Sequence, residues 1–217
     1  MNETLIQELE AYAIACDVCA SLLVKAPTKE SLDALAGSKD LLADEPFVSI
    51  SAEASQALVG DLVAYEENPE AVLSEYRQDY TFLFEMVSLS KASPFESVYV
   101  TEDRTLCGPA LLDIRSLFGK WGVKLPEGAA TLEDHIGFEL SFVSHLLHVA
   151  LEHVEKDEAC DAELEAAGSF IADHINAFAH EYFTQAESVA RTDFYKHVMK
   201  LSFSLTERLT ERFVKTA

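Results

Sequence analysis

The sequence predicts an all-α fold, and three observations support that prediction. Glycine and proline are scarce, at 8 and 6 of 217 residues, which disfavours an architecture rich in turns. Apolar residues make up 49% of the chain, enough to bury one substantial core without metals or disulfides. These residues recur at spacings of three and four, which is the period of an α-helix. We therefore expect one helical bundle domain over residues 1–217.

The first predicted helix carries a continuous apolar stripe that ends at Pro27. Cys16 and Cys19 fall on that stripe, and their C-x-x-C spacing is also that of zinc and redox sites. Because Cys107 and Cys160 are isolated and no βαβ pattern surrounds the pair, we interpret Cys16 and Cys19 as reduced core residues. The stripe consists of Leu5, Leu9, Tyr12, Cys16, Cys19 and Leu23.

Short helices and one irregular segment are expected in the middle of the chain. The short helices fall near 31–35 and 54–66, separated by Gly37 and Pro46. Asn68 and Pro69 then supply an N-cap and a proline at the first helical position. The helical period breaks over 88–104, SLSKASPFESVYVTEDR, where we expect extended chain around Pro94. The helix that Pro69 opens has Val72, Tyr76, Tyr80, Leu83 and Val87 on one face, with Phe84 beside it.

Four helices are expected in the second half of the chain. The first should close at Gly122 in the left-handed conformation. Thr131 and Asp134 have the spacing of a capping box, so Asp134 and His135 are expected in the first turn of the next helix. That helix is apolar nearly all round, which is typical of a central helix. Two more helices are expected over roughly 159–183 and 192–214.

Charge limits the partners that this protein can have. Acidic residues number 38 and basic residues 16, a net charge of −22. Such a surface repels nucleic acid and anionic lipid and favours a basic partner. The N-terminus lacks the features of an export signal, and no apolar run is long enough for stable membrane insertion. We expect a cytoplasmic protein.

Sequence signatures of catalysis are absent. The chain contains neither GxGxxG nor GxxxxGK[ST] nor GxSxG, so nucleotide binding of the common types and nucleophilic hydrolysis have no support. The Glu-x-x-His pairs of di-iron bundles and the HExxH motif are missing too. We predict no catalytic residues, no cofactor and no metal. Two alternatives stay open: a metal-dependent helical enzyme using His135 and Glu139, and a purely structural helical subunit.

Several stretches of the sequence resemble one known family. They are TFLFEM at 81–86, SPFESVY at 93–99, Leu106-Cys-Gly108 and EDHIGFELSFVSHLL at 133–147. In this order and spacing they resemble the TorD/DmsD/NarJ family of redox-enzyme maturation chaperones. FIADHINAF at 170–178 and DFYKHVMKLSF at 193–203 extend the resemblance, which covers roughly residues 70–205.

The resemblance implies a single-domain helical chaperone without catalytic activity. Such a chaperone binds the twin-arginine signal peptide and the apo form of a molybdopterin oxidoreductase, assists cofactor insertion and delays export. Which oxidoreductase is the client stays open, as do direct binding of guanine nucleotide or molybdenum cofactor and the choice between monomer and homodimer. By motif match, the peptide-binding residues are Tyr80, Leu83, Phe84, Pro94, Phe95, Tyr99, Gly108, Asp134 and His135.

Two departures from the family pattern affect this site. Leu132 stands where the family often has proline, and tyrosine or phenylalanine replaces a frequent tryptophan at positions 80, 95, 99 and 178. Aromatic character is kept, so we expect binding to a client of different sequence. A basic and apolar leader needs acidic groups beside an apolar surface. We expect Glu133 and Asp134 to pair with guanidinium groups, and Leu83, Phe84 and Phe95 to hold the apolar part.

Overall fold

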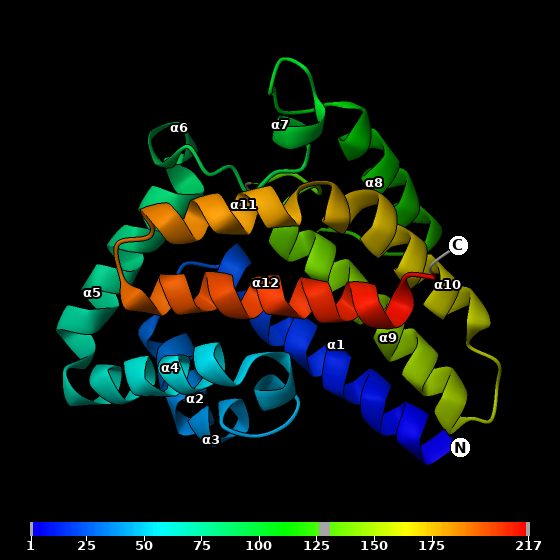
Figure 1. Cartoon of the computed structure of the whole chain (residues 1–217), viewed down its shortest axis with the longest axis horizontal. Helices are drawn as coiled ribbons and strands as arrows, with labels where there is room; N and C mark the ends of the chain where they lie inside the picture. The colour runs from blue at the N-terminus through cyan, green and yellow to red at the C-terminus, as the bar shows by residue number, and fades with distance from the viewer. Residues whose placement is uncertain (1, 126–130, 216–217) are drawn as a thin grey trace.

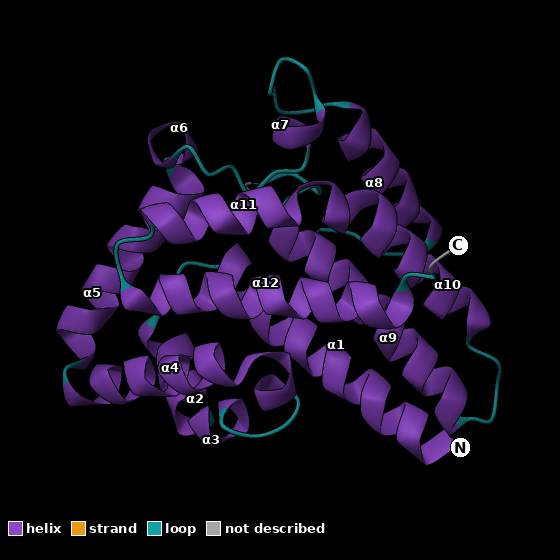
Figure 2. Ribbon diagram, viewed as in Figure 1, coloured by secondary structure: helices purple, strands orange, loops and turns teal. Residues whose placement is uncertain are grey.

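The regular elements of this protein are helices. The computed structural model describes residues 2–125 and 131–215, and within them no strand is present (Figure 2). One isolated antiparallel bridge joins Phe95 to His135. The all-α prediction is confirmed.

Long helices from both ends of the chain form the centre of the molecule. α1 (Asn2–Val24) packs along α9 (Ile136–Glu155), and α12 (Asp193–Phe213) packs against α1, α4 (Phe47–Glu67) and α11 (Asn176–Val189). Figure 1 shows α12 crossing the middle of the molecule with α11 alongside it. Residues on all sides of α9 are buried, as its apolar sequence predicted.

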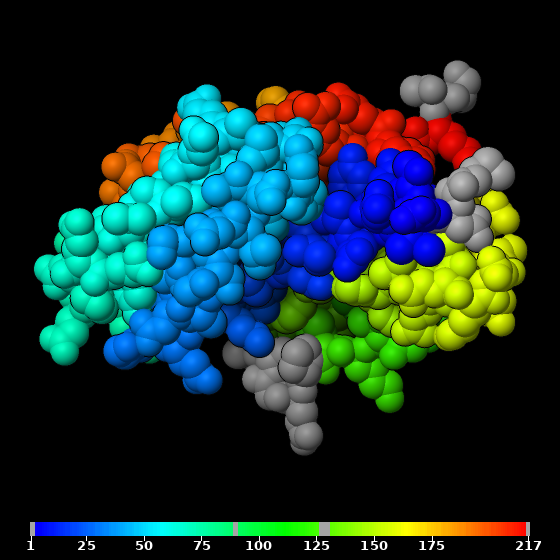
Figure 3. Space-filling view, turned by 90° about the horizontal axis from the view of Figure 1, so that it is seen from below, coloured from blue at the N-terminus to red at the C-terminus, as the bar shows by residue number. Residues whose placement is uncertain are grey.

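Shorter elements surround this centre. α2 (Lys29–Gly37) and α3 (Lys39–Leu42) pack on α4, and their blue-to-cyan surface adjoins the blue surface of α1 in Figure 3. The π-helical turns η1 (Thr81–Glu85) and η2 (Ile171–Ile175) continue α5 and α10 without a break. The other short helices are α5 (Pro69–Tyr80), α6 (Val87–Ser90), α7 (Ser97–Val100), α8 (Pro109–Lys120) and α10 (Asp161–Phe170).

In the first half of the chain, one helix start and one helix cap differ from the predictions. α4 begins at Phe47 and not near residue 54, because a short helical turn precedes the main helix and is separated from it by a kink at Ser51 (φ −161°, ψ 95°). That turn buries Phe47 and Ile50. Asn68 occupies the N-cap of α5, but its side chain accepts no capping hydrogen bond. Gly122 has a φ of 72°, which confirms the left-handed conformation expected after α8.

The C-x-x-C pair lies in the core. Cys16 and Cys19 are free thiols with at most 1% of their surface exposed. Burial raises the pKa of the Cys19 thiol to about 12 and that of Cys16 well above its usual value. Thiols held protonated in this way are poor nucleophiles and metal ligands. The interpretation of Cys16 and Cys19 as core residues is confirmed.

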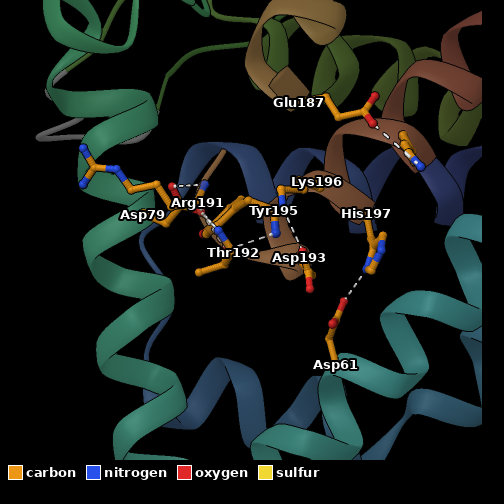
Figure 4. A network of polar contacts seen from close by, with 10 residues as sticks. Asp61, Asp79, Glu187, Arg191, Thr192, Asp193, Tyr195, Lys196 and His197 are labelled. Atoms are coloured by element: carbon orange, nitrogen blue, oxygen red, sulfur yellow. Dashed lines mark hydrogen bonds and ion pairs between the residues drawn. The ribbon is translucent and has the colours of Figure 1, made fainter. Parts of the chain in front are cut away.

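A buried aspartate fastens the start of α12 to α5. Asp79 accepts hydrogen bonds from the backbone amides of Arg191 and Thr192 and from the Thr192 hydroxyl, at 2.7–3.1 Å (Figure 4). Thr192 in turn caps α12 by accepting from the amide of Tyr195. Asp79 thereby satisfies amides that the helix start leaves without partners. Across the described residues, no helix is both long enough and apolar enough to cross a bilayer.

Candidate functional site

The segment before α7 lies antiparallel to the chain that leads into α9. The amide of Glu96 donates to the carbonyl of Asp134 at 2.9 Å, and the amide of Ile136 donates to the carbonyl of Pro94 at 2.8 Å. The amide of Ser97 also donates to the Asp134 carboxylate at 3.1 Å. These bonds bring the SPFES and EDHI stretches together, so the two most recognisable parts of the sequence form one site.

His135 caps α9 with its ring. Its Nδ1 accepts a hydrogen bond from the amide of Gly137 at 3.1 Å, so the neutral ring carries its proton on Nε2. Only 4% of His135 is exposed, and burial lowers its pKa to about 3. A histidine this hard to protonate is suited to hydrogen bonding and packing, not to proton transfer near neutral pH.

Aromatic side chains pack around His135. Its ring centroid lies 5.4 Å from that of Phe95 and 6.0 Å from those of Phe84 and Phe138. Phe84 stacks on Tyr80 at 4.6 Å, and the Tyr80 hydroxyl donates to the carbonyl of Val24 at 2.8 Å. Side chains of three separate stretches of chain, the α5–η1 helix, the segment before α7 and the start of α9, thus form a continuous aromatic cluster with edge-on and offset contacts.

The π-helical turn η1 carries two neighbouring buried residues of the predicted site. Leu83 and Phe84 are both buried, whereas adjacent residues of a regular α-helix point about 100° apart. A π-turn accommodates an extra residue and is frequent at functional sites. The second such turn, η2, supplies the buried His174, which contacts Glu96. The sequence showed the helical stripe but not these two turns.

Three buried carboxyl groups lie beneath the bridged segments. Asp134 and Glu139 are fully buried, and Glu96 is 3% exposed. Oε2 of Glu96 lies 3.0 Å from Nδ1 of His174. Burial, with repulsion from Glu96 and Asp134, raises the pKa of Glu139 well above its usual value. Neither oxygen of Glu139 has a hydrogen-bond partner among the described residues.

Tyr99 and Gly108 flank the outer side of α7. The Tyr99 ring lies 5.5 Å from that of Phe178 on α11, and the Arg104 guanidinium lies 5.9 Å from the Tyr99 centroid. A Cβ on Gly108 would lie 2.6 Å from Cγ2 of Thr101, so the close approach of α8 to α7 requires glycine. Of the nine predicted residues, Pro94, Phe95, Tyr99 and Gly108 lie in segment 93–108, and Asp134 and His135 are bridged to it. Phe84 contacts His135, Tyr80 stacks on Phe84, and Leu83 is buried next to Phe84 in the chain.

The capping box at Thr131 is not formed. α9 begins at Ile136, five residues later, and its N-cap is His135. The Thr131 hydroxyl is buried without a partner among the described residues, and Asp134 binds the segment before α7 instead of the start of its own helix. The prediction failed because the bridge to Phe95, a long-range contact, takes up the residues that the local pattern assigned to the cap.

Glu133 and Asp134 are both engaged within the chain. Glu133 forms a two-point ion pair with Arg115, at 2.7 Å to Nε and 2.8 Å to Nη2, and Arg115 lowers the pKa of Glu133. Asp134 is fully buried. Neither carboxylate therefore faces solvent as a free partner for a guanidinium group.

The alternative of a metal-dependent enzyme would require a cluster of side chains that can hold an ion. In the part of the chain that the structure describes, no group of three or more histidine, cysteine, aspartate or glutamate side chains is arranged for a metal. His135 already uses Nδ1 to cap α9. Glu139 is held in an environment that favours its neutral form, whereas a metal ligand must be ionised.

Glu96, Ser97 and His174 were missed in the sequence. Glu96 and Ser97 lie inside the SPFES stretch, in which only the apolar residues were assigned to the site. The acid directly after Phe95 was the one feature of the sequence that could have indicated a polar contact there. His174 lies 78 residues from Glu96, and no local pattern announces that pairing.

The fold and the site together define an all-helical protein in which an aromatic segment is bridged to the start of its central helix. Residues 49–184 match the family described as nitrate reductase delta subunit. That match covers more than half of the chain, so the chain belongs to this family. The family resemblance drawn from the sequence motifs is confirmed, and all nine predicted residues fall inside the matched range.

Named relatives point the same way. The chain is 31% identical over 134 residues to "Chaperone protein TorD" of Vibrio cholerae serotype O1 strain O395, covering 62% of this chain and 58% of the relative. It is 29% identical over 109 residues to "Chaperone protein TorD" of Vibrio cholerae serotype O1 strain N16961, covering 50% of this chain and 49% of the relative. It is 24% identical over 191 residues to "Chaperone protein TorD" of Vibrio vulnificus strain YJ016, covering 84% of this chain and 85% of the relative. The chain thus spans about half the length of the Vibrio cholerae relatives.

Proposed function

We propose that this protein is a cytoplasmic assembly chaperone for a molybdopterin oxidoreductase. It binds the twin-arginine signal peptide and the apo form of that enzyme, assists cofactor insertion and delays export. Membership of the nitrate reductase delta subunit family and the relatives named as TorD chaperones support this function. The net charge of −22 suits a basic leader. The protein acts by binding and carries out no reaction of its own.

The observation that carries the proposal is the bridge between Phe95 and His135. It holds a short aromatic segment against the start of the most buried helix, which makes that segment a rigid support for a ligand. Aromatic side chains bury much area with few rotamers to freeze, so they are effective anchors for a peptide.

The nine residues have two different roles in this proposal. Phe95 and Tyr99 are partly exposed and contact the apolar part of the leader. The others hold those rings in place. Tyr80, Leu83, Phe84 and Pro94 are buried behind them, Asp134 and His135 are buried and act through the bridge, and the partly exposed Gly108 acts by its lack of a side chain.

Calorimetric titration with synthetic leader peptides tests the function. Leaders of several molybdopterin oxidoreductases should be compared, each with its twin arginines intact and with both changed to glutamine. We expect at least one intact leader to bind and its glutamine version to bind more weakly. Absence of binding to every leader would reject the chaperone and favour the structural-subunit alternative.

Phe95→Ala tests the site. Truncating a central aromatic anchor costs about 2 kcal/mol or more of binding free energy, so we expect the leader affinity to fall roughly thirtyfold. Leu41→Ala on α3 is the matched control, because Leu41 is an exposed apolar residue at 63% exposure on a different part of the surface. Equal affinities of Phe95→Ala, Leu41→Ala and the wild type would place the leader elsewhere.

A further inference from the structure

A groove of about 550 Å³ runs between α8 and the continuous helix α10–η2. Figure 1 shows α8 and α10 at the same end of the molecule. α8 lines the groove with one face, and Phe142 of α9 contributes to its floor. Proteins bind amphipathic peptide segments in apolar grooves of this kind.

The floor and one wall of the groove are apolar. Phe142 and Phe170 are each 2% exposed and pack against each other at 4.7 Å. Leu117 and Trp121 on α8 are partly exposed above them. An aromatic ring beside an apolar floor suits the aliphatic stem and planar head of an arginine.

The rim of the groove is acidic. Asp113, Glu165 and Asp173 are exposed carboxylates along it. Among the described residues that line it, Lys120 is the one lysine or arginine, and its Nζ lies 6.0 Å from the centroid of the Trp121 ring. Within the described residues, Glu165 and Asp173 form no ion pair, and Asp113 has only His174, whose Nε2 lies 3.6 Å away. Among the described residues, Glu165 and Asp173 thus have no ionic partner, unlike Glu133, which pairs with Arg115.

His174 connects the groove to the bridged segments. It lines the groove, and its Nδ1 lies 3.0 Å from the carboxylate of Glu96. The amide of Glu96 in turn donates to the carbonyl of Asp134. The groove is therefore linked to the aromatic segment around Phe95 through the buried pair of His174 and Glu96.

Resting on the proposed function, we propose that this groove binds the arginine-bearing segment of the leader. The guanidinium groups pair with Asp173, Glu165 and Asp113, and their stems pack on Trp121. The apolar segment of the same leader continues onto Phe95 and Tyr99. The guanidinium site thus lies at α8 and α10–η2, and not at Glu133 and Asp134.

Trp121 reports occupancy of the groove directly. It is the single tryptophan of the sequence, so the intrinsic tryptophan fluorescence comes from this groove alone. A leader peptide free of tryptophan should shift the emission to shorter wavelength as it covers the ring. Unchanged emission at leader concentrations that saturate binding by calorimetry would overturn the inference.

Charge substitutions test the guanidinium contacts. The variant Glu165→Gln/Asp173→Asn removes two exposed carboxylates of the groove, and Glu30→Gln/Asp40→Asn on α2 and α3 is a control with the same change in net charge. Against the intact leader we expect the groove variant to lose about tenfold in affinity, and the control much less, because close charge pairs outweigh the general field. Against the leader with glutamine for arginine, the groove variant should bind as the wild type does.

Two results separate the inference from the function. If the wild type binds the intact leader and both double variants bind it equally well, the groove is not the arginine site and the chaperone function stands. If the wild type binds no twin-arginine leader, the proposed function fails and the inference fails with it. Equal losses against the intact and the glutamine leader would also overturn the inference, because the carboxylates would then not be recognising arginine.

Discussion

The backbone amide of Ser97 donates a hydrogen bond to the Asp134 carboxylate at 3.1 Å, although 37 residues separate the two. Asp134 also accepts, through its backbone carbonyl, from the amide of Glu96. One fully buried residue thus fixes the position of the aromatic segment with both its main chain and its side chain.

We expect Asp134→Ala and Asp134→Asn to differ sharply. Alanine leaves the Ser97 amide without a partner in the interior, which should cost about 1–3 kcal/mol of unfolding free energy and loosen the segment, so leader affinity should fall as well. Asparagine can still accept the bond through its side-chain oxygen, so stability and affinity should stay close to wild type. Thermal melts beside calorimetric titration measure both. Loss of affinity in Asp134→Asn with unchanged melting would show that the charge itself contacts the leader.

His135 should make the protein sensitive to mild acid. Its folded pKa of about 3 lies below the ordinary value of 6.5, so between these pH values the unfolded chain binds a proton that the folded chain does not. Stability should therefore be complete above pH 6.5 and fall by up to about 1.4 kcal/mol per pH unit as the pH decreases toward 3.

His135→Asn tests that acid sensitivity, because asparagine is a good N-cap that does not titrate. The difference in unfolding free energy between wild type and variant should change in favour of the variant as the pH falls from 6.5 to 4. A difference that stays constant over this range would contradict a buried neutral histidine.

Glu139 should have the opposite dependence on pH. Its folded pKa is raised well above 4.5 by burial and by neighbouring carboxylates, so the unfolded chain releases a proton that the folded chain keeps. Below pH 4.5 this has no effect, and stability is lost as the pH rises from there toward the folded pKa. Glu139→Gln should therefore be more stable than wild type at pH 7 and similar to it at pH 4. Denaturant titrations at both pH values measure this, and a variant that is less stable at pH 7 would show that the ionised carboxylate has a partner.

The long helices were predictable because their patterns are local. α1, α9 and α12 follow apolar stripes with the helical period, and burial of that stripe determines the helix. The starts of helices were less predictable. At Ser51 the backbone leaves the helical region without any glycine or proline at that position, and tertiary packing of the turn before it outweighs the local preference.

The site was predictable in its residues but not in its bonding. Motif resemblance identified Phe95, Asp134 and His135, and the fold brings them together. The roles of Asp134 and Thr131 were misread because a capping box is a local pattern, whereas Asp134 uses its hydrogen bonds on a segment 37 residues away. The contact between Glu96 and His174 could not be predicted from a helical or strand period either, because 78 residues separate the two.

The ion pair between Arg115 and Glu133 provides a final test of where the leader's arginines bind. Arg115→Gln releases the Glu133 carboxylate, which is 17% exposed, and adds one net negative charge. Arg208→Gln is the matched control, because Arg208 also pairs with a glutamate, at 2.9 Å, and its loss changes the net charge equally. If the arginines bind in the groove between α8 and α10, both variants should raise the affinity for an intact leader by the same small factor, less than about threefold, through the general field alone. A selective increase in Arg115→Gln that disappears with the glutamine leader would place a guanidinium group at Glu133 instead. Titrations at low and at physiological salt should be compared, because the shared effect of net charge weakens with screening, whereas a two-point pair at Glu133 would keep more of its selectivity.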